Sequence, residues 1–207
     1  GFKNLQSLNL WSTHVTDAGL KELAGLKNLQ SLKLHNTRIT DAGLKELTGL
    51  TDLRELRLGT NKVTDAGLKQ LTKLKNLQSL SLDFTKITDA GLKELAGLKN
   101  LQTLNLYLNT QLTDVGLKEL TSLTNLQELD LGSTQTTDAG LKELAKLRNL
   151  KVVRLQFTKV TDAGLEDLAG LKNLQRLSLR FTKVTDAGAQ KLKKALPGCE
   201  IGHGWEW

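Results

Sequence analysis

Thr-Asp pairs are the residues of this sequence whose types and spacing could carry chemistry. A Thr-Asp pair whose aspartate is followed two residues later by a glycine occurs eight times. The aspartates are Asp17, Asp41, Asp65, Asp89, Asp114, Asp138, Asp162 and Asp186. A carboxylate beside a hydroxyl can serve as a general base, a metal ligand or a phosphate contact. A catalytic site is needed only once in a chain, so the eight copies indicate a structural role instead.

The other reactive residue types do not combine into a site. Cys199 is the only cysteine, which excludes an internal disulfide and a cysteine-based zinc site. His14 and His35 fall at different positions of adjacent units, and His203 follows Glu200 in the C-terminal tail. The sequence contains neither a Gly-rich phosphate loop nor an HExxH motif. We therefore predict no catalytic residue, no metal site, no cofactor and no enzymatic activity.

The spacing of the aspartates reveals an internal repeat. Consecutive aspartates are 24 residues apart, except for the 25 residues between Asp89 and Asp114. A fixed period of this size indicates a solenoid, in which stacked units bury a continuous core. In the unit 26–49, leucines alternate with polar residues over 31–35, as in a strand, and Leu44 then begins the inward side of a short helix. Each unit is therefore predicted to add one parallel strand and one helix.

The repeated pattern resembles the leucine-rich repeat family over the whole chain. The units carry an L-x-x-L-x-L run, such as Leu29, Leu32 and Leu34, with a polar residue three positions further on; in one unit Val153 takes the place of the second leucine. We read the column that is usually Asn or Cys in this family as Thr13, Thr37, Asn61, Thr85, Thr110, Thr134, Thr158 and Thr182. The helical segment is similar to bacterial repeats of the same layout and to the cysteine-containing repeats of ubiquitin-ligase adaptors. The cysteine columns and an F-box-like segment are absent, so no ligase role is implied.

The resemblance implies a single α/β domain over residues 1–207. We expect a leucine-rich-repeat solenoid of eight repeats, with a parallel β-sheet on the concave side and short α-helices on the convex side. Residues 187–207 depart from the pattern and are expected to form a C-terminal cap and tail, in which Cys199 is a small buried residue.

The Thr-Asp pairs would then precede the helices. Threonine or aspartate is the expected N-cap at this position, because its side-chain oxygen accepts a backbone N–H that the helix leaves unpaired. An aspartate there also meets the positive end of the helix dipole. The glycine that follows would allow the helix backbone to approach its neighbour closely.

Function is expected where the units differ from one another. The resemblance implies that the outward residues of the strands line a concave face, which in this family usually binds a partner. These positions vary strongly, whereas the helical segments hardly change; neutral drift of solvated positions is the alternative explanation. The candidate binding residues are Trp11, Lys33, His35, Arg57, Asp83, Phe84, Tyr107, Leu108, Asp130, Arg154, Phe157, Arg180 and Phe181. They predict recognition of a protein or peptide ligand, in which a stacked Phe157 and Phe181 would either anchor the partner or pack the sheet rim.

One unit is longer than the others. The segment between Leu106 and Asp114 holds one residue more than the corresponding segment of the preceding unit. An extra residue cannot enter a strand without turning inward side chains outward. We therefore expect it to bulge around Leu108 and Asn109, beside Tyr107, which makes Tyr107 a candidate hot spot. A neutral insertion, which loops tolerate at little cost, is the alternative.

The net charge of +7 keeps an anionic partner under consideration. A basic row follows the threonine column and consists of Arg38, Lys62, Lys86, Lys159 and Lys183. Units stacked about 4.8 Å apart would align these cations along an anionic polymer, nucleic acid or acidic polysaccharide, and this is the alternative function. We favour a role in solubility and expect no nucleic acid partner, because no aromatic side chains interleave with the row. A third alternative is a consensus-like or engineered scaffold without a natural ligand, since the units are nearly identical.

The chain ends and the apolar content favour a cytoplasmic location. No apolar run reaches the ~18 residues that a membrane-spanning helix needs, and no signal peptide is visible. A single cysteine is consistent with a reducing compartment. Phe2 and Leu5 begin the first strand without a preceding cap. We therefore expect missing upstream sequence and an open edge strand that can pair with a second copy.

Overall fold

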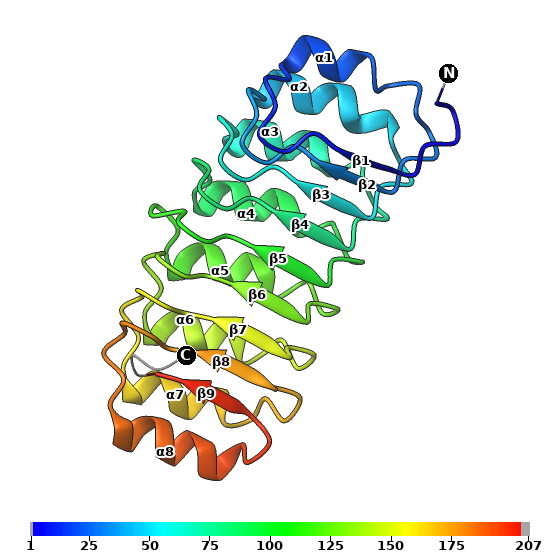
Figure 1. The fold of residues 1–207 in the computed structure, drawn as a ribbon. Helices are drawn as coiled ribbons and strands as arrows, with labels where there is room; N and C mark the ends of the chain where they lie inside the picture. Colours follow the sequence, from blue (N-terminus) through cyan, green and yellow to red (C-terminus); the bar gives the residue numbers. More distant parts are fainter. Residues whose placement is uncertain (1, 204–207) are drawn as a thin grey trace.

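The computed structural model describes residues 2–203. Within this range, nine parallel strands form one sheet in sequence order, and eight α-helices cover one face of this sheet (Figure 1). The strands are β1 (Ser7–Asn9), β2 (Ser31–Lys33), β3 (Glu55–Arg57), β4 (Ser79–Ser81), β5 (Thr103–Asn105), β6 (Glu128–Asp130), β7 (Val152–Arg154), β8 (Arg176–Ser178) and β9 (Glu200–Gly202). The helices are α1 (Asp17–Lys21), α2 (Asp41–Leu44), α3 (Asp65–Leu71), α4 (Asp89–Leu95), α5 (Asp114–Leu120), α6 (Asp138–Leu144), α7 (Asp162–Leu168) and α8 (Asp186–Ala195), with a 3-10 helix η1 (Lys45–Gly49) after α2. The predicted solenoid, with its sheet on the concave side, is confirmed.

Leucine ladders between the sheet and the helices form the core. The middle residue of each strand pairs with the middle residue of the next, as Leu32 does with Leu8 and Leu56. From β2 to β8 these residues are buried, and they join inward helix leucines such as Leu44 and Leu47 in one cluster. Because side chains alternate along a strand, the two residues that flank each middle residue point away from the core. This register creates the outward columns from which a binding face can be built.

The Thr-Asp pairs link successive repeats. Thr113 caps helix α5, and its hydroxyl accepts the backbone N–H of Val115 at 3.2 Å. The carboxylate of Asp89, one repeat earlier, accepts the N–H of Thr113 at 2.8 Å and its hydroxyl at 2.6 Å. The same two bonds join Asp17 to Thr40 and recur in every later repeat as far as α8. The expectation that the aspartate could be the cap is therefore wrong: the threonine caps the helix, and the aspartate holds the next repeat.

The glycine of the motif makes room for this bridge. A Cβ on Gly116 would lie 2.5 Å from Oδ1 of Asp89, and one on Gly140 would lie 2.4 Å from Oδ1 of Asp114. The predicted close approach is confirmed, with the aspartate side chain of the preceding repeat as the group approached. At the end of the ladder no further threonine follows Asp186, and Nε2 of His203 lies 3.0 Å from its carboxylate.

Asparagines form a second ladder at the opposite edge of the repeats. Nδ2 of Asn100 donates to the carbonyl of Lys75, one repeat earlier, at 2.9 Å, and Asn125 does the same to Lys99. Basic side chains add a bond in the other direction, as Lys75 does to the Gly97 carbonyl at 3.3 Å. This carbonyl lies just beyond a helix C-terminus, where a cation is favourable. Part of the positive charge of the chain is thus engaged in holding the repeats together.

The extra residue of the long repeat lies after the buried asparagine position. Nδ2 of Asn109 donates to the carbonyls of Leu106 and Leu82, as Asn61 does to those of Leu58 and Leu34. Asn109, and not Thr110, therefore belongs to the Asn/Thr column, and our assignment of Thr110 is corrected. The expected bulge at Leu108 is also wrong. Leu108 has a φ of 61°, within the range of 52° to 61° that its counterparts adopt in all eight repeats, and the extra turn lies at 110–111.

The ends of the described chain differ in their packing. Cys199 is buried before β9, as expected, and burial raises the pKa of its thiol to about 11. At the other end, β1 is an edge strand of the described sheet, and Leu5, Leu8 and Leu10 are only partly buried. Pairing of this edge with a second copy stays a prediction. No helix among residues 2–203 is long and apolar enough to cross a membrane.

Candidate binding face

The candidate binding residues lie along the sheet and the turn that follows it. Lys33, Arg57, Asp130 and Arg154 are outward strand residues. Trp11, His35, Asp83, Tyr107 and Arg180 come two residues after a strand, and we call this position the third column. Phe84, Leu108, Phe157 and Phe181 come next, each with a left-handed backbone. The register brings these residues together in four groups along the face.

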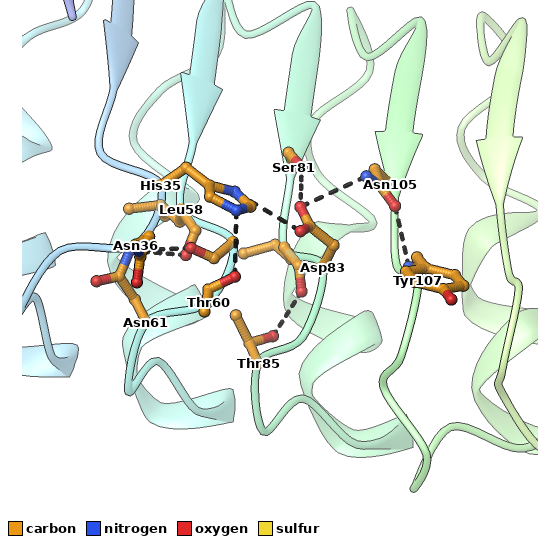
Figure 2. A network of polar contacts seen from close by, with 12 residues as sticks. His35, Asn36, Leu58, Thr60, Asn61, Ser81, Asp83, Thr85, Asn105 and Tyr107 are labelled. Carbon is orange, nitrogen blue, oxygen red and sulfur yellow. Dashed lines mark hydrogen bonds and ion pairs between the residues drawn. The ribbon is translucent and has the colours of Figure 1, made fainter. Parts of the chain in front are cut away.

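The first group is a polar network over β2 to β5 (Figure 2). His35 packs edge-on against Trp11, with ring centroids 5.3 Å apart. Nε2 of His35 lies 3.2 Å from the Thr60 hydroxyl, and Nδ1 lies 3.6 Å from the Asp83 carboxylate. The Ser81 hydroxyl and Nδ2 of Asn105 donate to the same carboxylate, the latter at 3.4 Å. These contacts hold Asp83 in one place on the face.

Gly59 makes the contact between His35 and Asp83 geometrically feasible. It occupies the third column in the repeat between them, and a Cβ there would lie 2.3 Å from Oδ1 of Asp83. Asp83 therefore reaches over Gly59 toward His35. Gly132 has the same role further along, since a Cβ there would lie 2.6 Å from Nε2 of Gln156 and 2.8 Å from Cδ2 of Tyr107. Both glycines let side chains of non-adjacent repeats approach one another.

The order hydroxyl, imidazole, carboxylate in Thr60, His35 and Asp83 resembles that of a hydrolytic triad. Such a site also needs N–H donors for the oxyanion, and the N–H of Thr60 already donates to the Asp83 carbonyl at 2.8 Å. The carboxylate of Asp83 is engaged by Ser81 and Asn105. We therefore interpret the network as a shaped polar surface. No group of three or more potential metal-ligating side chains occurs in the described part of the chain.

The second group centres on Glu55, which pairs with both nearby cations. Its carboxylate lies 2.7 Å from Nε of Arg57 and 3.9 Å from Nζ of Lys33, and it accepts the Ser31 hydroxyl at 2.7 Å. Partial burial raises the pKa of the Glu55 carboxyl, but the bonds from Ser31 and Arg57 and the two positive charges outweigh it, so its pKa lies below the usual value. Glu55 therefore offsets part of the positive charge that Lys33 and Arg57 bring to this end of the face.

The third group surrounds Tyr107 at the centre of the array. Asp130 accepts the N–H of Gly132 at 2.9 Å. Burial raises the pKa of the Asp130 carboxyl above the usual value, although Gly132, Arg154 and Gln156 act in the opposite direction. The half-buried Tyr107 is thus accompanied by a carboxylate that is itself half-buried. Tyr107 does lie at the centre of the face, but without the raised loop that we expected beside it.

The fourth group is the aromatic pair near the C-terminal end. The rings of Phe157 and Phe181 are stacked, with centroids 4.4 Å apart and planes inclined by 10°. The guanidinium of Arg180 lies 6.0 Å from the centre of the Phe181 ring. The predicted stacking is confirmed, and 52% of the Phe157 surface remains exposed.

The basic row runs along the rim beside the turns. Lys62 and Lys86 line a shallow hollow together with Phe84 and Leu108, and 57% of the Phe84 surface is exposed. The expectation that no aromatic side chain accompanies the row is therefore wrong at this point. Phe84 comes two residues before Lys86 in the sequence. In the folded chain it also lines the same hollow as Lys62 of the preceding repeat.

Sequence reasoning missed several residues that shape the face. The candidate residues from the sequence do not include Gly59, Thr60, Asn105, Gly132 or Gln156. A usable signal was present, because both glycines interrupt a column that otherwise carries side chains. A missing side chain in such a column indicates that larger neighbours can meet above it.

Comparisons with known proteins agree with this geometry. Residues 41–199 match the model of a "Leucine-rich repeat region", and residues 3–63 match that of a "Leucine rich repeat". The crystal structure of an internalin C2 from Listeria monocytogenes is 32% identical, with a TM-score of 0.76, over 95% of this chain and 80% of that one. A second internalin from the same organism, inlF, is 26% identical with a TM-score of 0.77; 99% of this chain aligns with 55% of that one. No curated protein matches the chain.

Proposed function

Because this chain belongs to the leucine-rich repeat family, we propose that it is a non-catalytic scaffold that recognises a protein or peptide with its concave face. Solenoids of this kind present extended concave surfaces for binding. The observation that carries the proposal is the organisation of the variable residues. Two glycines, Gly59 and Gly132, interrupt the side chains of the third column, so that His35 meets Asp83, and Tyr107 and Gln156 both lie over Gly132. Ordered side chains of this kind lose little conformational entropy when a partner binds.

Tyr107 is the residue on which we test the proposal. Tyrosine is enriched in interface hot spots, and Tyr107 lies in the middle of the face with charged residues around it. Peptide ligands would be selected from a random library on the full chain, and their affinities measured by calorimetry. Tyr107→Ala should weaken binding by ~2 kcal/mol or more. Lys118→Ala, on the exposed side of α5, is the matched control and should change nothing. Equal affinities of the Tyr107→Ala variant and the parent, with equal melting curves, would contradict the proposal.

A second candidate function is binding of an anionic polymer along the basic row. The hollow that joins Phe84 with Lys62 and Lys86 favours it, because a ring beside cations can stack on a base while the cations contact phosphate. Affinity for a single-stranded oligonucleotide should then fall steeply with salt, since each neutralised phosphate releases counterions. Loss of this affinity in Lys62→Glu and Lys86→Glu would support this function, and binding that ignores both salt and these charge reversals excludes it.

A further inference from the structure

The C-terminal end of the concave face contains a groove with its own chemistry. It has a volume of about 380 Å³ and crosses β7, β8 and β9, where Val152, Phe157 and Arg176 are among its lining residues. Its apolar part is unusual for this face. The first outward column otherwise carries serine, threonine, glutamate or arginine, whereas β7 has Val152, which is only 5% exposed.

Cations surround this apolar floor. Arg176 lies directly beside Val152 on the neighbouring strand and is exposed, and Arg154 is two residues further along β7. Arg180 also lines the groove and packs near Phe181. Glu200, beside Arg176 on β9, is the one carboxylate among the lining residues. Asp130 attracts Arg154 from the adjacent strand. The lining therefore combines an apolar surface with an excess of arginine, and arginine pairs well with carboxylates because its planar fork matches them.

An unsatisfied acceptor lies in the same place. Gln156 lines the groove, and its Oε1 is buried without a hydrogen-bond partner among the described residues. Its Nε2 lies over Gly132, where an added Cβ would be 2.6 Å away. A buried acceptor without a donor is costly. Because Oε1 is buried, a ligand in the groove reaches it only after the Gln156 side chain rotates.

We propose that this groove binds an acidic peptide segment that carries an aromatic or large aliphatic side chain. The apolar side chain lies on Val152 and the exposed surface of Phe157, and the flanking carboxylates contact Arg176 and Arg154. This inference rests on the proposed function and names the chemistry of its ligand. A purely anionic polymer fits less well, because it would leave the apolar floor uncovered.

The repeats themselves supply substitutions that suit the fold. Glu55 and Glu128 occupy the position of Val152 in other repeats, and Ser12 and Ser133 occupy that of Phe157. Val152→Glu and Phe157→Ser are therefore compatible with the backbone at these positions. Arg176→Glu reverses the charge, and Lys118→Glu on α5 makes the same charge change away from the groove. Melting curves establish that each variant is folded.

Fluorescence anisotropy of the full chain would use a labelled peptide in which Asp and Glu flank one Phe. Its control peptide has Lys in place of both acids and Ala in place of Phe. We expect the acidic peptide alone to bind, and the three groove variants to lower its affinity roughly tenfold or more, the size expected when a contact at the centre of an interface is lost. Lys118→Glu should leave it unchanged. If heparin and the peptide bind equally well, and Phe157→Ser weakens the binding of neither, the groove is an anion site only and the proposal is overturned.

Two further arms separate this proposal from others. The last residues of the chain, Trp205, Glu206 and Trp207, have the composition of the proposed ligand. If the peptide binds only to a variant that ends at His203, the chain itself competes for the groove, and the proposal of a partner there is wrong. If library ligands lose affinity with Tyr107→Ala but not with the groove variants, the proposed function stands and this inference fails.

Discussion

The carboxylate of Asp83 lies 3.6 Å from Nδ1 of His35, although the two residues belong to repeats that are not neighbours in the stack. The repeat between them carries Gly59 in the same column, and the Asp83 side chain occupies the space above it (Figure 2). The shape of the face is therefore decided by a residue without a side chain. This relationship turns a row of separate outward residues into a connected surface.

Gly59→Ala should break this contact without unfolding the chain. A Cβ 2.3 Å from Oδ1 of Asp83 forces the carboxylate away from His35, but the atoms that must move belong to a side chain that can rotate on the surface. Gly59 is buried beneath Asp83, and the displaced carboxylate loses the bonds from Ser81 and Asn105. We therefore expect the free energy of unfolding to fall by ~1 kcal/mol, the usual net contribution of a hydrogen bond. NMR resonances of the His35 ring should shift. Gly25→Ala, where an added Cβ meets nothing within 4 Å, is the control and should leave the His35 resonances in place.

Asp89→Ala should destabilise the chain through the loss of an inter-repeat link. The substitution leaves the N–H and hydroxyl of Thr113 without their acceptor. Hydrogen bonds to charged groups contribute about 1.5–3 kcal/mol, so we expect a loss of ~2 kcal/mol in urea unfolding. Asp186→Ala, at the end of the ladder, removes only the contact with His203 and should cost much less. Equal losses at both positions would show that the aspartates act as helix caps after all.

Asp130→Asn should stabilise the chain at neutral pH and lose this effect in acid. Burial raises the pKa of Asp130 above its ordinary value of 3.8, so the ionised carboxylate is less favourable in the folded chain than in the unfolded chain. It therefore lowers stability at pH values above the raised pKa, and protonation removes the penalty as the pH falls through that pKa and below 3.8. The asparagine retains an acceptor for the Gly132 N–H, and its amide can donate to Oε1 of Gln156. Urea unfolding at pH 7 and pH 3 measures the difference. A variant less stable than the parent at pH 7 contradicts this account.

Deletion of Thr110 should be tolerated, whereas deletion of Leu108 should not. Thr110 is exposed and lies in the extra turn, so its removal restores the length of the other repeats. It should also restore a backbone bond to the Ile87 carbonyl like the one from Lys86 to Val63, which is 3.1 Å long. We expect a melting temperature equal to or above that of the parent. Removing Leu108 shifts Asn109 out of its buried position and should lower the melting temperature by ten degrees or more, because buried amide bonds and packing are lost together.

Repetition made the fold predictable from the sequence. The period of 24 residues fixed the stack, and the alternation over 31–35 fixed which side chains point inward, because a strand has only two faces. The threonine cap and the crowded glycine also follow from local rules on helix ends. The stacking of Phe157 on Phe181 could be expected, since equal positions of adjacent repeats lie side by side.

Only the tertiary structure decided how unlike residues of different repeats meet. The carboxylate of Asp89 binds Thr113 of the next repeat, while the Thr88 hydroxyl makes the capping bond of α4. The position of Asn109 was set by two carbonyls, one of which belongs to the preceding repeat. The contact of His35 with Asp83 depends on the space above Gly59. The sequence shows that residue 59 is a glycine, but it does not show which side chain occupies the space above it.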